Sequence, residues 1–379
     1  MKIPLTIPSF DKEEETAVAK VLRSGWVTQG PKVAEFEEEI AAYTGAKYAV
    51  ATTSATTSLF LSLYMLGIGE GDEVILPSFT FIATANVVAS LKAKPVFVDI
   101  DPKTYNIDPR QIEKAITKKT KAIMPVDQVG LPADLKSIVA IAKKHKLYVV
   151  EDAACGFASI YDGYQIGSYP GVHLICLSFH PRKSITTGEG GMILTQDKKL
   201  ADRAKVLRHH GMSVSDLTRY KSKKIMNEKY YEIGFNFRMS DIQAAVGLEQ
   251  LKKLPKFLKI RKRIADKYTK VFSNYENIIP PFVPDNCIPN WQSYVIKLRN
   301  SKRSERDRIM QKLLDSGIAT RRGVMAAHME PAYQKLLGKV RLPITEESAN
   351  TTISLPLFTT MKAKEQKYVI KKVLEFTRG

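Results

Sequence analysis

The stretch that decides the fold is residues 172–194, which read VHLICLSFHPRKSITTGEGGMIL. Two apolar runs, residues 172–177 and 192–194, are predicted to be buried strands, and a short polar loop that ends in glycines joins them. The loop places Lys183 at a turn inside the protein. Burial disfavours the charged form of an amine, so we expect a lowered pKa for Lys183 and a neutral amine that can attack a carbonyl carbon. The alternative is an ordinary hairpin with a solvated lysine.

Strands and helices alternate before this stretch. Apolar strands are predicted at residues 48–52, 73–76, 95–100, 122–126 and 147–150, and helices at residues 11–24, 32–43, 55–66, 82–93, 109–117 and 133–145. This alternation predicts an α/β fold with a mostly parallel central sheet flanked by helices. Ligands bind at the carboxyl ends of the strands in such sheets, and Ser54, Ser78 and Asp152 fall at those ends.

The rest of the chain predicts a different organisation. A long helical stretch begins at Asp241 and is expected to break at Leu254-Pro255. Beyond it, the pattern predicts a strand at residues 292–298, helices at residues 304–317 and 362–377, and a polar loop at residues 320–331. We therefore expect a large domain over residues 1–250, with an N-terminal helical segment, and a smaller C-terminal α+β domain over residues 251–379, both of normal size.

The composition is that of a soluble folded protein. Of the 379 residues, 44% are hydrophobic and 26% are charged, which is a usual balance for globular domains. No apolar run approaches the ~20 residues of a membrane span, and the first ten residues lack the apolar core of a signal peptide, so we expect no membrane partner and a cytoplasmic location. Cys155, Cys176 and Cys287 form no CxxC pair and are expected to be reduced thiols rather than disulfides or metal ligands.

The net charge of +19 raises the question of nucleic-acid binding. Most lysines are distributed over the predicted helix faces, and the one dense basic cluster, residues 256–263, has the spacing of an amphipathic helix. No zinc pattern, aromatic RNA-binding motif or basic arm accompanies this cluster. We therefore expect no nucleic-acid partner and assign the charge to solvated surfaces or to attraction of phosphorylated substrates.

Other segments hold residues that suit the chemistry of a reactive lysine. Asp152 ends a strand where a carboxylate can keep the ring nitrogen of a pyridine cofactor protonated, although an acid there can also cap the next turn. Helix N-termini bind phosphate, and a predicted helix begins with Ser54, Ala55 and Thr56, although serine and threonine are also ordinary caps. Phe81 could stack on a planar ring or simply belong to the core.

Taken together, the chain resembles the DegT-type nucleotide-sugar aminotransferases, which are pyridoxal-phosphate enzymes of the aspartate-aminotransferase fold, or fold type I. The resemblance runs nearly end to end. It includes the segments SGW (residues 24–26), QGP (29–31), PSFTF (77–81), EDAA (151–154) and GFNFRMS (234–240).

The resemblance implies a role for each of these residues. Lys183 forms the Schiff base with pyridoxal phosphate and shuttles protons, Asp152 pairs with the pyridine nitrogen, and Phe81 stacks on the ring. The phosphate contacts are Ser54, Ala55, Thr56 and Ser178. Asn236 reaches the cofactor from a second subunit, which implies a homodimer whose active sites are shared between the subunits.

The chain also departs from the usual pattern of the family. Cys155 stands where members often have a cofactor-contacting His or Gln, and Val126-Asp127 replaces a Val-His pair. The substrate-side loop, which often holds a His-Tyr pair, reads TRRG at residues 320–323. Candidate substrate contacts are Trp26, Thr28, Arg321, Arg322 and His328. The two arginines could bind a diphosphate bidentately or could be a solvated pair.

The implied function is transfer of an amino group from an amino acid, with L-glutamate expected, to a keto group of a nucleotide-linked deoxysugar, for amino sugars of surface polysaccharides or glycoconjugates. A pyridoxal-phosphate-dependent sugar dehydratase of the same fold is the nearest alternative, but those members carry His where Lys183 stands. A non-catalytic nucleic-acid-binding or regulatory protein would leave the lysine, the aspartate and the phosphate-site residues without a role.

Overall fold

A seven-stranded sheet forms the centre of the computed structural model, which describes residues 1–214, 219 and 222–377. The strand order is β1-β9-β8-β5-β4-β2-β3. The strands are β1 (Tyr48–Thr52), β2 (Glu73–Pro77), β3 (Lys94–Val98), β4 (Thr120–Ile123), β5 (Tyr148–Asp152), β8 (Leu174–Ser178) and β9 (Gly191–Thr195). β9 is antiparallel to β1 and β8, and the other neighbouring pairs are parallel. The predicted α/β fold is confirmed.

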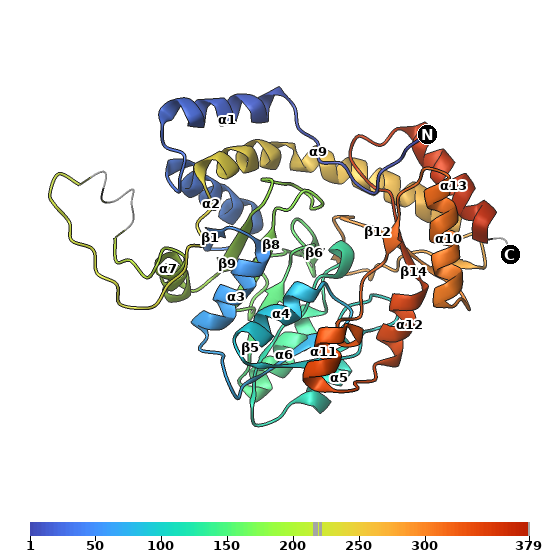
Figure 1. Cartoon of the computed structure of the whole chain (residues 1–379), viewed down its shortest axis with the longest axis horizontal. Coiled ribbons are helices and arrows are strands. Elements are labelled where there is room, and N and C mark those ends of the chain that lie inside the picture. The colour runs from blue at the N-terminus through green and yellow to red at the C-terminus, as the bar shows by residue number, and fades with distance from the viewer. Residues whose placement is uncertain (215–218, 220–221, 378–379) are drawn as a thin grey trace.

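Helices cover both faces of this sheet (Figure 1). They are α2 (Pro31–Thr44), α3 (Ala55–Met65), α4 (Ile82–Ser90), α5 (Pro109–Ala115), α6 (Leu135–His145) and α7 (Lys198–Leu207). Successive side chains of a strand point to opposite faces, so Val149 of β5 packs in the core that contains Phe36 of α2, and Val150 packs in the core that contains Leu59 of α3. Each strand thus contributes to two apolar layers.

The long helix α9 (Asp241–Phe272) joins this part of the protein to the C-terminal part (Figure 1). The predicted break at Leu254-Pro255 is wrong, because the helix continues through Pro255. A proline inside a helix removes one hydrogen bond, but Leu254 before it and Phe257 after it are both buried in the core beneath the sheet. The next turns bury Ile264 and Tyr268 in a different core. Tertiary packing on both sides of Pro255 therefore maintains the helix.

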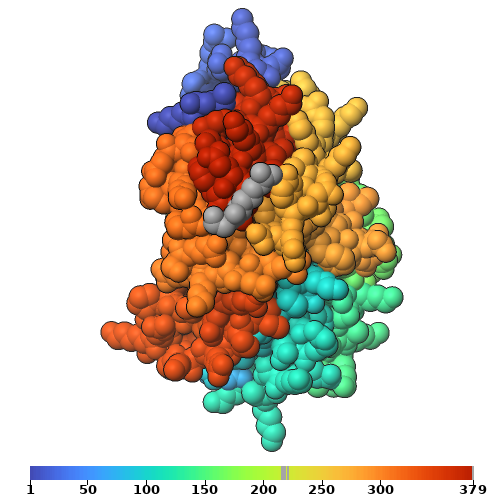
Figure 2. All heavy atoms as spheres, turned by 90° about the vertical axis from the view of Figure 1, so that its right-hand side faces the viewer, coloured from blue at the N-terminus to red at the C-terminus, as the bar shows by residue number. Residues whose placement is uncertain are grey.

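A four-stranded sheet with the order β10-β12-β14-β13 forms the centre of the C-terminal part. The elements here are β10 (Ile278–Ile279), β12 (Tyr294–Leu298), α10 (Arg303–Asp315), β13 (Arg321–Arg322), α11 (Pro331–Leu337), α12 (Pro343–Thr351), β14 (Thr352–Leu355) and α13 (Ala363–Thr377). A small third sheet comprises β6 (Ile160–Tyr161), β7 (Tyr164–Gln165) and β11 (Cys287–Ile288). Figure 2 faces the side where the orange and red C-terminal helices lie against the yellow α9.

The chain crosses between the two parts more than once. Near the N-terminus, Ile3 donates its backbone N–H to the carbonyl of Gly317 and packs in the C-terminal core. In the opposite direction, Tyr333 and Leu342 pack in the core of the seven-stranded sheet. The predicted division into residues 1–250 and 251–379 falls inside α9 and stays a prediction. In the described ranges, no helix combines the length and apolarity that a bilayer crossing requires.

Candidate active site

A cavity of about 720 Å³ lies at the carboxyl ends of the parallel strands. One wall consists of residues that end or follow β1, β2, β5 and β8, and the facing wall includes residues of β13 and β14. The cavity therefore lies where a parallel α/β sheet binds its ligands. Among the predicted site residues, those that line it are Ser54, Ala55, Thr56, Phe81, Asp152, Cys155, Ser178, Lys183, Arg321 and Arg322.

Lys183 lies in the loop between β8 and β9, which pair as an antiparallel hairpin with Ser178 opposite Gly191. Side-chain hydroxyls fix this loop, since Thr186 Oγ1 donates to the carbonyl of Phe179 at 2.8 Å. Lys183 is half-buried. The expectation that it lies inside the protein is therefore wrong in part, because the loop carries the amine out of the apolar strands to the cavity wall. There, Nζ lies 3.1 Å from Sγ of Cys155.

Asp152, at the end of β5, presents a buried carboxyl group to the same cavity. Its Oδ2 accepts a hydrogen bond from Thr84 Oγ1 at 2.7 Å, and its Oδ1 accepts one from the backbone N–H of Ala154 at 3.2 Å. Burial raises the pKa of Asp152, while these hydrogen bonds and the charge of Lys183 lower it. A cationic group placed against this carboxyl would favour its ionised form.

The start of α3 forms an anion site. Ser54 is the N-cap, and it exchanges side-chain and backbone hydrogen bonds with Thr57. The first N–H groups of a helix have no partner within the helix and attract anions, and here they belong to Ala55 and Thr56 on the cavity wall. Gly191 of β9 packs against this turn so closely that a Cβ would lie 2.3 Å from the carbonyl carbon of Ser54. The glycine at the end of the Lys183 loop is therefore required by close approach.

Phe81 projects from the cavity wall just before α4. Its side chain is 60% exposed, so the alternative that it belongs to the core is wrong. An exposed phenyl ring on a cavity wall is suited to stacking against a planar ligand. Ser178, at the end of β8, lines the same cavity and is buried.

Behind Asp152 lies a pair of fully buried acids, Asp127 and Glu151. Burial raises the pKa of Asp127 to about 7, and burial together with the charge of Asp127 raises the pKa of Glu151 still further above its ordinary value. Oδ2 of Asp127 and both carboxyl oxygens of Glu151 are buried and have no hydrogen-bond partner among the described residues, which favours a protonated form. Asp127 Oδ1 accepts from the N–H of Ala133 at 2.9 Å. The unusual Val126-Asp127 pair thus provides Glu151 with an acidic partner.

Two predicted substrate residues, Trp26 and Thr28, lie outside the cavity, on the turn before α2. Trp26 Nε1 donates to the carbonyl of Gln29 at 3.2 Å, and the carbonyl of Thr28 accepts from the N–H of Asp241 at 3.0 Å. The carboxylate of Asp241 in turn accepts from the N–H of Gly30 at 2.8 Å. This turn is thereby fixed to the start of α9.

His328 and Asn236 also lie outside the cavity. His328 is buried, with Nδ1 2.6 Å from Ser78 Oγ and Nε2 3.4 Å from a carboxylate oxygen of Glu346. These contacts tie the segment after β2 to the segment before α11, which is a structural role. Asn236 is exposed and forms a backbone bridge with His209.

Arg182, Thr84 and Gln292 belong to the site, but no sequence motif predicts them. Arg182 is half-buried and lines the cavity, and its carbonyl accepts a hydrogen bond from Gln292 Nε2 at 2.8 Å. In the sequence, only its position next to Lys183 indicates that Arg182 belongs to the site. Nothing in the sequence around Thr84 and Gln292 indicates a site role, because their hydrogen-bond partners are 68 and 110 positions away in the chain.

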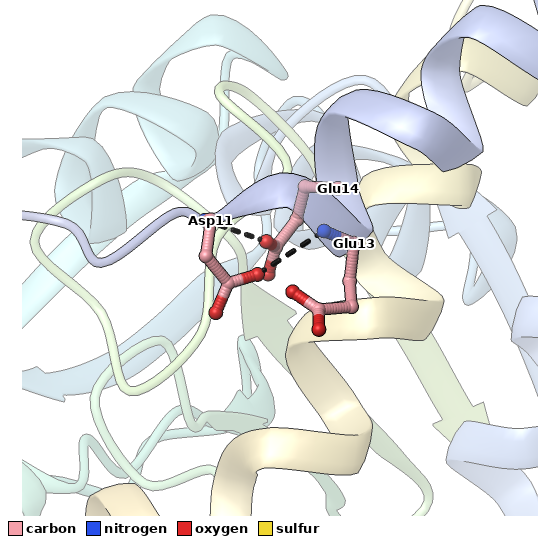
Figure 3. Close-up of side chains that lie close together, drawn as sticks. All are labelled: Asp11, Glu13 and Glu14. Carbon is pink, nitrogen blue, oxygen red and sulfur yellow. Dashed lines mark hydrogen bonds between the residues drawn. The ribbon is translucent and has the colours of Figure 1, made fainter.

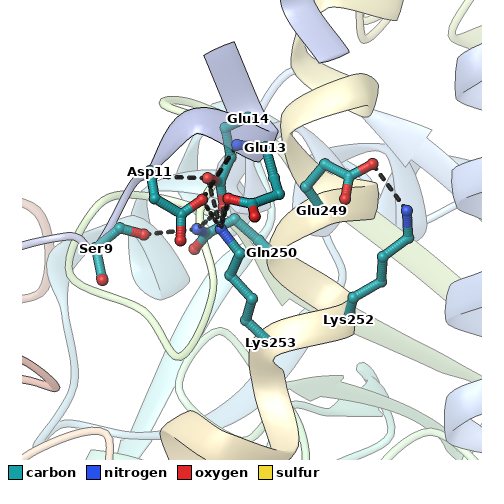
Figure 4. A network of polar contacts seen from close by, with 8 residues as sticks. All are labelled: Ser9, Asp11, Glu13, Glu14, Glu249, Gln250, Lys252 and Lys253. Carbon is teal, nitrogen blue, oxygen red and sulfur yellow. Dashed lines mark hydrogen bonds and ion pairs between the residues drawn. The ribbon is translucent and has the colours of Figure 1, made fainter. Parts of the chain in front are cut away.

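An acidic cluster outside the cavity is occupied by a lysine. Asp11, Glu13 and Glu14 lie close together at the start of α1 (Lys12–Ser24), as Figure 3 shows. Nζ of Lys253, on α9, forms ion pairs with Asp11, with Glu14 at 2.7 Å and with Glu13 at 3.8 Å (Figure 4). The ammonium group offsets part of the charge of the three carboxylates and joins α1 to α9, so the cluster has a role in packing.

Comparisons with known proteins agree with this geometry. The model of the DegT/DnrJ/EryC1/StrS aminotransferase family matches residues 8–374, and the chain belongs to this family. The chain is 40% identical over 384 residues to the spore coat polysaccharide biosynthesis protein SpsC of Bacillus subtilis (strain 168). The aligned region covers 100% of this chain and 97% of SpsC.

Solved structures of the same fold cover the whole chain. The PLP form of Spr1654 from Streptococcus pneumoniae has a TM-score of 0.93 at 30% identity, covering 100% of this chain and 99% of that chain. PseC of Helicobacter pylori, an aminotransferase involved in the biosynthesis of pseudoaminic acid, has a TM-score of 0.92 at 30% identity, with the same coverage.

The cofactor is pyridoxal phosphate, and the residues of the cavity fit it. The cavity offers an amine for the aldehyde, a buried carboxyl for the ring nitrogen, an exposed phenyl ring for the ring face and a helix N-terminus for the phosphate. Lys183 would provide the amine and Asp152 the carboxyl for the ring nitrogen. Phe81 would stack on the ring, and the start of α3 with Ser178 would hold the phosphate.

Proposed function

We propose that this aminotransferase moves an amino group from L-glutamate to a keto group of a nucleotide-linked deoxysugar, for the synthesis of amino sugars of surface polysaccharides or glycoconjugates. The observation that carries this proposal is the meeting of Lys183, Asp152 and the start of α3 in one cavity. The similarity to SpsC, which is named for polysaccharide biosynthesis, supports a carbohydrate substrate.

The residues of the chain have distinct parts in this reaction. Bound pyridoxal phosphate supplies a ring that withdraws electrons from the reacting carbon and carries the amino group between the two substrates. Lys183 Nζ takes a proton from the substrate carbon and returns it. The carboxylate of Asp152 would hold a proton on the ring nitrogen of the bound cofactor, and the α3 N-terminus would hold its phosphate.

The reaction is tested with the purified holoenzyme. L-Glutamate with a heavy nitrogen isotope is supplied together with candidate nucleotide keto-sugars, and the aminated product is detected by mass spectrometry. Lys183→Ala should abolish the product, and Lys143→Ala, a substitution on α6, should not. Product formation by Lys183→Ala at the rate of the unmodified enzyme would disprove the assignment of Lys183.

We also propose that the enzyme is a homodimer in which Asn236 completes the cavity of the partner subunit. Asn236 is exposed and does not line the cavity of its own chain, and the exposed apolar side chains of Tyr231 and Ile233 lie just before it in the sequence. Contact with a second copy would remove this apolar surface from water.

Subunit mixing tests the shared site. Lys183→Ala and Asn236→Ala should each have little activity, but a mixture of the two should recover part of it, because one of the two sites in a mixed dimer contains both native residues. No recovery after subunit exchange, with mixed dimers verified by mass, would contradict the shared site.

A further inference from the structure

Two arginines line the cavity, and neither forms an ion pair with a carboxylate among the described residues. Arg182 precedes Lys183, and Arg321 comes from β13 in the facing sheet. Burial lowers the pKa of Arg182, and the nearby charge of Arg321 lowers it further. Two like charges on the walls of one cavity repel one another, so an anion bound between them would be stabilised.

The charged and titratable side chains near the two arginines do not take the place of a bound anion. Arg322 is already paired, since its Nη2 donates to Glu330 Oε1 at 3.2 Å. Burial lowers the pKa of His180, and its Nδ1 accepts from the backbone N–H of Arg182 at 3.2 Å, which favours a neutral ring. Glu189 lines the same cavity, but it is exposed, and it raises the pKa of His180. Cys155 raises the pKa of Arg182, but burial has a larger effect and lowers it.

The backbone of both arginines is fixed by the fold. Gln292 Nε2 holds the carbonyl of Arg182, and the backbone N–H of Gln292 donates to Asn290 Oδ1 at 2.7 Å. Asn290 is buried and also donates to the carbonyl of Cys155 at 2.7 Å. Arg321 is paired with Ser354 in the β13–β14 ladder. The two guanidiniums therefore come from rigid supports on opposite walls of the cavity.

We propose that Arg182 and Arg321 form a second anion subsite, separate from the start of α3, which binds the α-carboxylate of the amino donor. This inference rests on the proposed function. A guanidinium donates two parallel hydrogen bonds to a planar carboxylate. The α-carboxylate is bonded to the carbon whose proton Lys183 moves, and Arg182 is the next residue to Lys183. The diphosphate of a nucleotide-linked sugar is attached several bonds away from the keto carbon.

The donor half-reaction tests this subsite without any keto-sugar. The absorption change of the bound cofactor is recorded in the holoenzyme as the glutamate concentration is increased. Arg182→Gln and Arg321→Gln should each raise the half-saturating glutamate concentration about 10- to 100-fold, as expected for loss of a charge-assisted contact. Arg308→Gln is the matched control and should change it by less than about threefold, because Arg308 is exposed on α10, pairs with Glu305 and does not line the cavity.

A binding measurement separates recognition from turnover. Glutarate, a dicarboxylate that cannot donate an amino group, is titrated into the holoenzyme by calorimetry. The Kd of glutarate should rise in Arg182→Gln and Arg321→Gln but not in the control Arg308→Gln, and Arg182→Lys should recover part of the affinity. Thermal unfolding of each variant confirms that it is folded.

Two results would overturn the subsite. One is unchanged glutamate and glutarate binding in both variants with a raised KM for the nucleotide-linked sugar alone, which would assign the arginines to the diphosphate. The other is the absence of any glutarate binding to the unmodified enzyme. A failure to aminate every keto-sugar would contradict the proposed function and leave the donor half-reaction as a separate result.

Discussion

Nζ of Lys183 lies 3.1 Å from Sγ of Cys155 on the wall of the cavity. The carbonyl of Cys155 accepts a hydrogen bond from the buried Asn290, so the backbone of Cys155 is fixed while its side chain reaches the reactive amine. In the sequence, Cys155 stands out only as a departure from the usual His or Gln. In the structure, it is a direct neighbour of Lys183.

Cys155 should therefore be the first thiol to react with iodoacetamide in the apoprotein. Cys176 and Cys287 are buried, whereas Cys155 is half-buried at an open cavity, and reaction with a thiol requires access. Intact-mass measurement should show a single rapid addition, which Cys155→Ser removes and pyridoxal phosphate slows. Equally rapid labelling of Cys176, detected by peptide mapping, would contradict this assignment.

Thr84→Val should shift the pH dependence of activity. The hydroxyl of Thr84 lowers the pKa of Asp152 against the effect of burial. Its loss raises that pKa, so the acid limb of the kcat/KM profile should move to higher pH, with activity on that limb reduced about tenfold.

Asp152→Asn provides the contrast for Thr84→Val. It removes the ionisable group and should lower kcat about 10²- to 10⁴-fold across the profile. An unchanged acid limb in Thr84→Val, with normal folding, would show that the Thr84 contact does not tune Asp152.

Lys253→Met should destabilise the packing of α1 on α9. Glu14 is buried and would lose the ammonium group 2.7 Å away, and we expect a loss of ~1–3 kcal/mol in the free energy of unfolding. Lys252→Met is the matched control, because Lys252 is exposed and its ion pair among the described residues is with Glu249 on its own helix, a contact worth less than ~0.5 kcal/mol. Urea unfolding monitored by circular dichroism measures both. Equal losses in the two variants would contradict a specific role for Lys253.

Local patterns predicted much of the fold and part of the site. The strand at residues 48–52, the Ser54 cap and the Lys183 hairpin depend on neighbouring residues, and the structure has all three. The predicted helix break at Pro255 was wrong, because helix propensity describes only local preferences, which tertiary packing can override. Likewise, His328 was predicted as a substrate contact, but Ser78 and Glu346 hold it in the interior.

Contacts between distant segments could not be predicted in this way. The neighbourhood of Arg182 and Arg321 exists only because the second sheet packs over the ends of the first. The same is true of the hydrogen bond between Thr84 and Asp152, because these two residues are 68 positions apart in the sequence and meet only in the folded chain. Charge repulsion and shared protons depend on distance and burial, and the sequence pattern reports neither.

The buried pair of Asp127 and Glu151 should make stability fall with rising pH. In the unfolded chain, Asp127 ionises near its ordinary pKa of 3.8, whereas in the folded protein its pKa is about 7. Between these values, the folded protein holds a proton that the unfolded chain has lost, so the free energy of unfolding decreases as the pH rises and levels off above the folded pKa. The pKa of Glu151, which is raised further, adds to the decrease at higher pH.

Asp127→Asn should weaken this dependence. The carbonyl oxygen of asparagine can still accept from the N–H of Ala133, and its amide group can donate to Glu151, which lowers the pKa of Glu151. We expect the Tm of the unmodified protein to fall by several degrees between about pH 5 and about pH 8, and that of Asp127→Asn to fall by less than half as much. Asp202→Asn, at an exposed ion pair with Lys198, should retain the original dependence. If Asp127→Asn retained it as well, the pair would not hold a proton at neutral pH, and the unusual residue at position 127 would need another explanation.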